Sequence, residues 1–421
     1  MRTAAFLMAC AAAFAADDDW PNYRGPNYDG VARGVVPLEF SLTKNLAWKV
    51  HIPGRGHSSP VIWGNRIFLT TAIPTAAAGD EYAPNLRKEH RLVVMCLDRN
   101  TGKLLWERNP KTVTPPDGHQ VPYGSYASNI PVTDGRRVYF FWESRGIFVY
   151  DLDGKLEWQK DFPQLRKRGE FGEGTPAMFD GDTLYLKFDQ EQNSYLIALD
   201  KNSGKELWRV DRAEPSSWSP PLMVTHNGKK QLIVAGTRVR SYDPSTGKLV
   251  WECAGLGLNS IPSMVSANGV VYAMTGFQNP NMLAIRIDRE GDLTGTDAVL
   301  WSNNRGNPYN PSPVLKDDIL YFISDTAMLS AFKASTGEAY YRQQRLPGAY
   351  SLKASPVAVN GKLHFATEQG DVVVVKMGEK FEVLATNKMG DDMFIATPAV
   401  AGNNMYLRGK NTLYCVRQAA P

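Results

Sequence analysis

The residues best able to do chemistry stand in short polar segments, each just before one of eight spaced prolines. Twelve of them combine positive charge, carboxylate, amide and aromatic character: Arg55, His57, Tyr126, Glu170, Glu173, Trp218, Asn259, Arg305, Tyr309, Asn310, Lys353 and Asp392. Such cations can hold a carboxylate-bearing ligand, carboxylates can transfer protons or bind calcium, and aromatic rings can stack on a sugar or a peptide. If the fold gathers these segments, the sequence predicts a ligand-binding site assembled from many short pieces.

Several familiar catalytic motifs are missing from the sequence. It has no glycine-rich phosphate loop, no serine-nucleophile elbow, no His-Glu-x-x-His and no Cys-x-x-Cys. His57 and His119 are the only histidines near the polar segments, and a single loop histidine is more often a hydrogen-bonded residue than a catalyst. No spacing of carboxylates supplies the roughly six oxygen ligands that calcium needs. We therefore assign no catalytic residue and no metal ligand from the sequence.

The prolines that follow these segments mark a repeat. They are Pro60, Pro131, Pro176, Pro220, Pro262, Pro313, Pro356 and Pro398. Apart from the first interval they are ~42–51 residues apart, which is the length of four short strands and their turns. The longer first interval holds two insertions, at residues 73–90 and 109–120. This period predicts a β-propeller, in which the polar segments connect successive blades and gather at one mouth of the central channel.

Each repeat contains alternating apolar runs, a turn related to Asp-x-x-Ser/Thr-Gly, and then a strand with a large aromatic residue. The turn at Asp200 leads through Gly204 to Trp208, and a similar turn leads to Trp251. Alternation places every second side chain against a neighbouring blade, the turn glycine supplies a positive φ, and the tryptophan packs between blades. Eight prolines and eight positions of this aromatic strand, the last of them weaker copies, predict eight blades.

The first and last repeats are incomplete in complementary ways. Residues 397–417 supply only about three strands, whereas a strand from Leu46 to Val50 precedes the first proline. This N-terminal strand would complete the last blade and close the ring, which removes the open sheet edges. The predicted fold is therefore all-β, an eight-bladed β-propeller over residues 46–418 that follows an extension at residues 17–45.

Residues 1–16 are typical of a secretory signal. Arg2 is followed by an alanine-rich apolar run and by a small-residue cleavage site near Ala15. Cys10 follows a faint lipoprotein-like pattern in which Met8 is unusual, so we expect soluble export to the periplasm or the medium rather than a lipid anchor. No later stretch of 18 apolar residues predicts a membrane span.

Charge and cysteine content exclude further classes of protein. The chain has 47 Lys+Arg and 43 Asp+Glu, so loss of Arg2 leaves 46 − 43 = +3, without a basic cluster for nucleic acid. Cys96, Cys253 and Cys415 cannot all pair with one another, and we interpret them as buried packing residues. We expect a monomer without a cysteine-ligated haem or zinc.

The turn and tryptophan pattern resembles the repeat of pyrroloquinoline-quinone (PQQ) propellers. Further similar stretches are Trp20-Pro21-Asn22-Tyr23-Arg24-Gly25-Pro26 and residues 126–135, 198–210 and 381–387. The chain is thereby similar to exported bacterial PQQ-like propeller proteins. More distantly it resembles the propeller lipoprotein of outer-membrane β-barrel assembly and the quinoprotein alcohol dehydrogenases. The resemblance covers nearly all of the exported chain and implies the propeller fold.

The dehydrogenases have features that this sequence does not reproduce. They carry an adjacent-cysteine disulfide over the cofactor and hold calcium with Glu, Asn and Asp beside a catalytic Asp, and neither set can be placed here residue by residue. The sequence therefore favours a non-catalytic exported scaffold that binds an envelope protein, a polysaccharide or a small ligand, without a cofactor. Two alternatives stay open. One is a PQQ- and calcium-dependent oxidoreductase of alcohols or sugars, and the other is an outer-membrane protein assembly factor.

Overall fold

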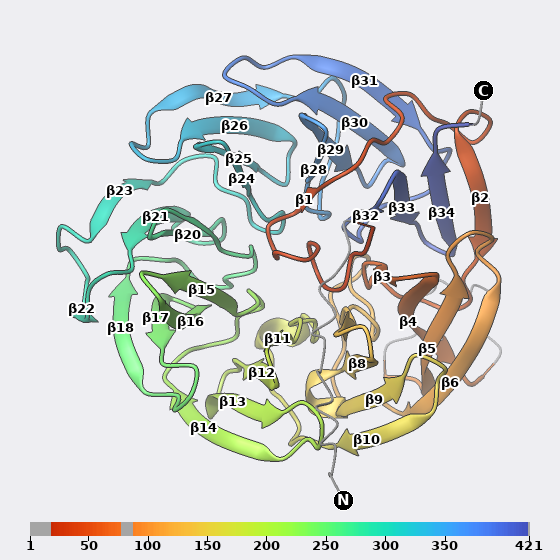
Figure 1. Ribbon diagram of the computed structural model, residues 1–421, viewed down its shortest axis with the longest axis horizontal. Coiled ribbons are helices and arrows are strands. Elements are labelled where there is room, and N and C mark those ends of the chain that lie inside the picture. Colours follow the sequence, from red (N-terminus) through yellow and green to blue (C-terminus); the bar gives the residue numbers. More distant parts are fainter. Residues whose placement is uncertain (1–17, 77–86, 420–421) are drawn as a thin grey trace, which may run out of the picture.

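The computed structural model describes residues 18–76 and 87–419 as eight sheets of antiparallel strands arranged in a ring (Figure 1), and a short parallel strand is added at the edge of two of them. The predicted all-β, eight-bladed propeller is confirmed. Each repeat proline lies just before the innermost strand of its blade, where its missing N–H interrupts no ladder. Within the described residues the only helices are the 3₁₀ turns η1 (Glu143–Arg145) and η2 (Arg168–Glu170), and neither could cross a membrane.

Blades 1 to 4 each proceed along the chain from an inner to an outer strand. Blade 1 contains β3 (Val61–Trp63), β4 (Arg66–Pro74), β5 (His90–Asp98) and β6 (Leu104–Val113). Blade 2 contains β7 (Val132–Thr133), β8 (Arg137–Phe141), β9 (Ile147–Asp151) and β10 (Leu156–Lys160). Blade 3 contains β11 (Met178–Asp180), β12 (Thr183–Phe188), β13 (Ser194–Asp200) and β14 (Glu206–Arg212). Blade 4 contains β15 (Leu222–His226), β16 (Lys229–Ala235), β17 (Arg238–Tyr242) and β18 (Leu249–Ala254).

Blades 5 to 8 complete the ring. Blade 5 contains β19 (Val265–Ala267), β20 (Val270–Thr275), β21 (Asn281–Arg286) and β23 (Val299–Asn303), while β22 (Gly291–Asp292) is added to the edge of blade 4. Blade 6 contains β24 (Val314–Lys316), β25 (Ile319–Ile323), β26 (Met328–Lys333) and β27 (Ala339–Arg345). Blade 7 contains β28 (Val357–Val359), β29 (Lys362–Ala366), β30 (Asp371–Lys376) and β31 (Val383–Lys388). Blade 8 contains β32 (Ala399–Ala401), β33 (Asn404–Arg408), β34 (Thr412–Arg417) and β2 (Leu46–His51).

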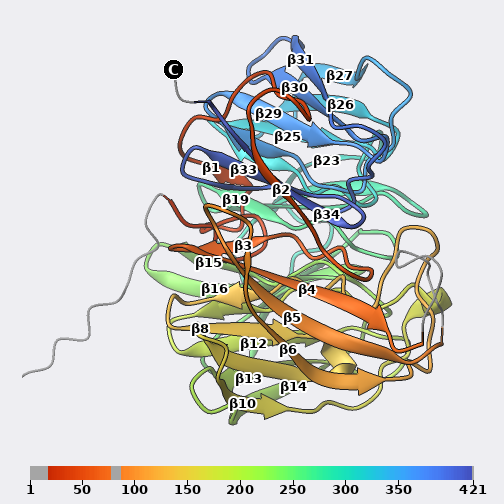
Figure 2. The same cartoon turned by 90° about the vertical axis from the view of Figure 1, so that its right-hand side faces the viewer.

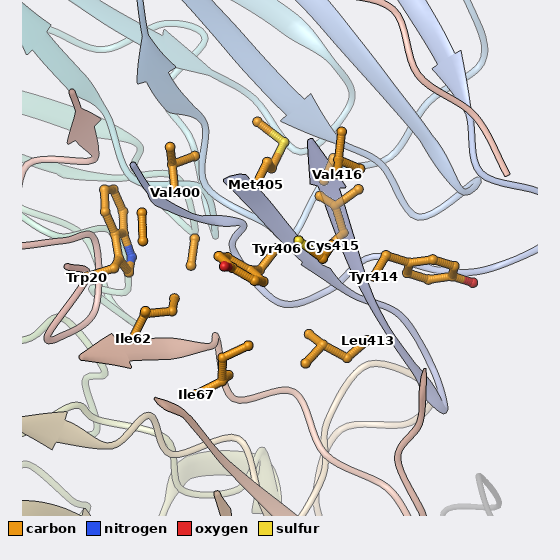
Figure 3. Close-up of a cluster of buried hydrophobic side chains, with 14 of the residues drawn as sticks. Trp20, Ile62, Ile67, Val400, Met405, Tyr406, Leu413, Tyr414, Cys415 and Val416 are labelled. Carbon is orange, nitrogen blue, oxygen red and sulfur yellow. The ribbon is translucent and has the colours of Figure 1, made fainter. Parts of the chain in front are cut away.

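The ring closes where its two ends meet in blade 8. The N-terminal strand β2 pairs antiparallel with β34, and Trp48 lies opposite Cys415. Figure 3 shows the apolar core beside this joint, where Trp20 and Ile62 lie near Val400 and Tyr406. The predicted closure by the N-terminal strand is therefore confirmed, and it is stabilised by shared burial as well as by the backbone ladder.

The N-terminal extension crosses one end of the channel before it reaches β2 (Figure 1). Trp20 exchanges two backbone hydrogen bonds of 2.9 Å with Ile62 in blade 1, and the Thr133 amide of blade 2 donates to the Pro21 carbonyl at 2.8 Å. The strand β1 (Val31–Ala32) then pairs in parallel with β28 of blade 7. The extension thus lies on the face that carries the hairpins between the first and second strands, and we call this the closed face. The predicted signal segment lies outside the described residues.

Outer-strand tryptophans connect five of the blades to the next blade in the ring. Trp208 of blade 3 packs against Gly247 in the turn of blade 4, and its indole N–H donates to the Pro244 carbonyl at 3.0 Å. An equivalent hydrogen bond, from the indole N–H to a backbone carbonyl of the next blade, joins Trp48 to Arg99, Trp106 to Leu152, Trp158 to Lys201 and Trp301 to Ala334. The three described cysteines are buried without a disulfide, which confirms their interpretation as packing residues.

Candidate binding site at the channel mouth

A cavity of about 220 Å³ lies where the connections between blades converge, opposite the closed face. Tyr23 of the extension contributes to its inner end, and Ser59, Pro176 and Pro220 line it at the start of the inner strands. Six of the twelve residues predicted as ligand-binding line the same cavity: His57, Glu173, Trp218, Tyr309, Asn310 and Lys353. The structure therefore brings half of the predicted set together.

One wall of the cavity is aromatic. The rings of Phe171 and Trp218 lie 6.4 Å apart, and the Trp218 indole N–H donates to the Gly172 carbonyl at 2.9 Å. The ammonium group of Lys167 lies 5.4 Å from the centre of the Trp218 ring. These contacts fix the indole in the wall while leaving part of it exposed, so it offers a rigid apolar surface to a ligand.

The opposite part of the wall is formed by Tyr309 and Lys353. The Tyr309 ring stacks on Phe277 at 5.1 Å, and its amide donates to Asp325 at 2.8 Å. Lys353 lies 3.3 Å from the same Asp325 carboxylate and 3.8 Å from that of Glu368. Because its charge is balanced within the protein, Lys353 is poorly suited to neutralise a strongly anionic ligand.

Glu173 lines the cavity, and its carboxylate is paired with Arg145. Its oxygens accept the Ser144 amide at 2.9 Å and face the Arg145 guanidinium at 3.2 Å. Burial raises the pKa of Glu173, whereas the positive charge of Arg145 lowers it. A carboxylate held in this way is part of a structural ion pair, and breaking it to transfer a proton would leave Arg145 buried without its partner.

His57 contributes a neutral imidazole to the cavity. Burial lowers its pKa well below the ordinary value, and the charges of Arg55, Arg408 and His119 lower it further. A general base works best when its pKa is near the working pH. His57 is therefore a weak base at neutral pH, but it can still contact an uncharged polar ligand.

Three of the predicted residues hold the blade 1 insertions or the segment that follows them instead of lining the cavity. Arg55 donates through its Nε to the Gly124 carbonyl at 2.9 Å. The Tyr126 hydroxyl donates to the Asp117 carbonyl at 3.0 Å. Glu170 forms a bidentate ion pair with Arg87, at 2.6 and 2.7 Å. Tyr126 and Glu170 thus bind residues of the two insertions, and Arg55 binds the segment that follows the second insertion. Residues 77–86 of the first insertion lie outside the described residues.

The other three predicted residues also lie outside the cavity lining. The Asn259 amide donates to the Tyr309 hydroxyl at 3.2 Å and so supports the wall from behind. Arg305 is exposed on the connection between blades 5 and 6. Asp392 accepts the Tyr414 hydroxyl and the Lys410 amide, each at 2.7 Å, and so stabilises blade 8.

Sequence analysis overlooked a second set of loops at this mouth, the turns between the second and third strands. Several of these turns carry a carboxylate whose partner is a nearby cation. Glu143 pairs with Lys167 at 3.1 Å, Asp189 with Arg212 at 2.8 Å, and Asp325 and Glu368 with Lys353. An acidic residue soon after the second apolar run of a repeat is the signal that could have found them. The ligand-facing mouth is therefore lined by charges that are neutralised within the protein.

A comparison with models of protein families identifies the family of this chain. Residues 90–343 match the family model PQQ_2, described as outer membrane protein assembly factor BamB. The chain belongs to this family. No curated protein matches the chain. The family assignment agrees with the resemblance seen in the repeat, and it covers blades 1 to 6 in large part.

Solved structures share the fold of this BamB-family chain at low sequence identity. BamB from Moraxella catarrhalis has a TM-score of 0.61 and 13% identity over 89% of this chain and 98% of that chain. Quinohemoprotein alcohol dehydrogenase from Comamonas testosteroni has a TM-score of 0.67 and 11% identity over 97% and 82%. The computationally designed Ika8 protein has a TM-score of 0.59 and 12% identity over 88% and 99%. At such identities these likenesses show the fold alone.

The residues at the mouth of this BamB-family propeller fit PQQ with calcium poorly. PQQ is a tricarboxylate, yet Lys353 already faces two carboxylates and His57 is neutral. Calcium needs roughly six oxygen ligands. In the described ranges no three His, Cys, Asp or Glu side chains are grouped as a metal site. The arrangement can bind a polar or amphipathic ligand, but it offers neither a charged cradle nor an ion cage.

Proposed function

We propose that the protein is a non-catalytic, exported scaffold that binds an extended segment of an envelope protein at the channel mouth. The observation that carries this proposal is the pairing of charges around the cavity. Glu173 and Lys353 are each paired with an oppositely charged residue, so the surface left for a ligand consists mainly of aromatic and aliphatic side chains, amides and hydroxyls. Such a surface suits uncharged polypeptide better than it suits a reaction that needs a free acid or base.

Family membership supports a polypeptide as the ligand. The family description names outer-membrane protein assembly, and nascent barrel strands are extended segments that alternate apolar with polar residues. The cavity is large enough for one or two side chains rather than for a folded domain. We therefore propose that the rings of Trp218 and Tyr309 receive an apolar side chain of the segment. The signal-like residues 1–16 support an envelope location.

Fluorescence anisotropy with a labelled decapeptide that alternates tyrosine or leucine with serine or threonine tests this proposal. We expect saturable binding by the wild-type protein. Trp218→Ala should weaken it by at least tenfold, because a buried tryptophan anchor is commonly worth about 2 kcal/mol. Arg305→Ala is the matched control, because Arg305 is exposed at the same mouth and outside the cavity.

Near-ultraviolet circular dichroism of each variant shows whether the fold is retained. Equal affinity of the wild-type protein and a folded Trp218→Ala variant would overturn the cavity as the binding site. Steady turnover of an alcohol or sugar by the purified protein would overturn the non-catalytic assignment.

A further inference from the structure

Exposed leucines recur one or two residues before the outer-strand tryptophan in five consecutive blades. They are Leu104 and Leu105 in β6, Leu156 in β10, Leu207 in β14, Leu249 in β18 and Leu300 in β23, each 43–52% exposed. They make up six of the ten large apolar side chains that are exposed in the described part of the chain. Packing of the fold does not require an apolar residue at a position that faces water, so the recurrence calls for another cause.

The apolar character is confined to the beginning of each outer strand. The residue that directly follows the tryptophan is polar in every one of the five blades: Glu107, Gln159, Arg209, Glu252 and Ser302. Each outer strand therefore changes from an exposed leucine to a polar residue within two or three residues. A general preference for leucine in strands would not produce this gradient, because it would act along the whole strand.

Lysines accompany the leucines in four of these blades. Lys103, Lys155, Lys205 and Lys248 each follow the turn glycine directly and precede an exposed leucine by one or two residues. All four are exposed, and none forms an ion pair with another described residue. We call this set of four lysines and six leucines the lysine–leucine rim.

The rim follows the edge of the closed face. The turns that precede the outer strands are bonded to the hairpins between the first and second strands, as shown by Arg99 with Asn65 at 3.0 Å and Lys201 with Asp182 at 2.9 Å. One of those hairpins also binds the extension, because the Gly64 amide donates to Asp19 at 2.7 Å. Figure 2 shows the ring from its side, with β6, β10 and β14 along its circumference. The rim therefore lies on the opposite side of the ring from the mouth.

We propose that the lysine–leucine rim rests on a phospholipid surface. The leucines occur as one or two residues per blade around more than half of the circumference and form no continuous patch of the kind that a protein interface needs. A bilayer is a planar partner that can contact all of them at once. Leucine side chains can enter its interfacial region, while the lysine ammonium groups reach the phosphates. Attachment by this rim leaves the mouth pointing away from the lipid.

Co-sedimentation with vesicles of phosphatidylcholine and phosphatidylglycerol in a 7:3 ratio tests this proposal, with the predicted exported form from residue 17 onward. We expect the wild-type protein to bind at 50 mM NaCl. The triple variant Leu156→Ser, Leu207→Ser, Leu249→Ser should bind at least tenfold more weakly. The control replaces an exposed apolar residue at the mouth, Val121→Ser, and should bind like the wild type.

A second variant separates the contribution of the lysine charges to vesicle binding from that of the leucine side chains. Replacing Lys103, Lys155, Lys205 and Lys248 with glutamine should reduce binding several-fold at 50 mM NaCl and have a smaller effect at 500 mM NaCl, because salt screens charge and not apolar contact. All substituted residues are exposed, so the variants should fold, which thermal unfolding checks. Absence of vesicle binding by the wild type, or equal loss in the rim and control variants, would overturn the proposal.

Discussion

Tryptophan side chains join neighbouring blades at one repeated place in this protein. The sequence predicted their packing from the Asp-x-x-Ser/Thr-Gly turn and the aromatic strand that follows it. It did not predict their hydrogen-bond partners, because the Trp208 indole reaches a carbonyl in the turn of the next blade rather than one in its own. Blade 5 shows the dependence on that turn. There the turn is replaced by a longer excursion, and Trp251 of blade 4 donates to Gln231 in its own blade at 2.7 Å.

Substitution of two glycines of blade 4 tests how much the tryptophan contact contributes to stability. Gly247 and Gly228 have nearly equal φ angles, 73° and 75°, but an added Cβ would lie 2.7 Å from Trp208 only at Gly247. We predict that Gly228→Ala lowers the free energy of unfolding by ~1 kcal/mol through left-handed strain. Gly247→Ala should lower the free energy of unfolding by a further ~1–3 kcal/mol, because its methyl group would overpack the interface with Trp208. Urea unfolding of both variants gives the comparison, and equal losses would contradict an inter-blade role for the tryptophan.

The buried His364 of β29 should make stability depend on pH. Burial lowers its pKa to about 4. Between pH 6.5 and 4 the unfolded chain binds a proton that the folded chain does not, so the folded state loses stability as the pH falls through this range. At pH 4.5 the loss is ~2–3 kcal/mol relative to pH 7.

The variant His364→Leu should lack this component of the pH dependence. The variant His226→Leu, at a partly exposed site in β15, should retain it. The measurement is the free energy of unfolding in urea at pH 7 and pH 4.5. Identical pH dependence in wild type and His364→Leu would show that the folded protein accommodates the protonated ring.

At the scale of the strand, β2 connects the two ends of the chain. Its position could be predicted by counting, because the last repeat has too few strands and the N-terminal part has one too many. The same counting could not predict how the extension crosses the closed face. Its hydrogen bonds join single residues to blades 1, 2, 6, 7 and 8, and no periodic pattern marks them.

Truncation separates the closing strand from the extension. A chain that begins at residue 46 keeps β2, whereas one that begins at residue 52 leaves β34 as an open edge. We predict that the shorter chain unfolds less cooperatively and associates at micromolar concentration, because exposed edges pair with other chains. Light scattering after size-exclusion chromatography and thermal unfolding measure these effects. A monomeric, cooperatively unfolding chain from residue 52 would contradict closure by β2.

The location of the candidate site could be predicted from the sequence, but the side chains that line it could be predicted only in part. The segments before the prolines do converge on one mouth, which repeat spacing alone could predict. Which side chains reach the cavity depends on contacts outside the repeat. Glu170 pairs with Arg87 of a blade 1 insertion, Arg55 bonds the segment after the second insertion, and Lys353 is held by Asp325 from a different set of turns. These binding partners are not repeated from blade to blade, so the sequence period cannot predict them.

At the scale of the whole molecule, the ring has two unlike faces. The extension covers one end of the channel, and the lysine–leucine rim surrounds that face. The cavity opens at the other end, among loops whose charges are already paired. This arrangement places the proposed attachment surface and the proposed binding surface on opposite faces. The two proposals can therefore be tested independently, with variants that lie on opposite sides of the ring.

Calorimetric titration at the mouth tests the central claim, that the cavity is a binding site for polypeptide and not a redox site. The wild-type protein is titrated with the alternating decapeptide and, separately, with PQQ in the presence of calcium. We predict saturable heat with the peptide, abolished by Trp218→Ala, and only the heat of dilution with PQQ and calcium. Saturable binding of PQQ that is lost in Trp218→Ala, together with a flat peptide titration, would contradict the claim.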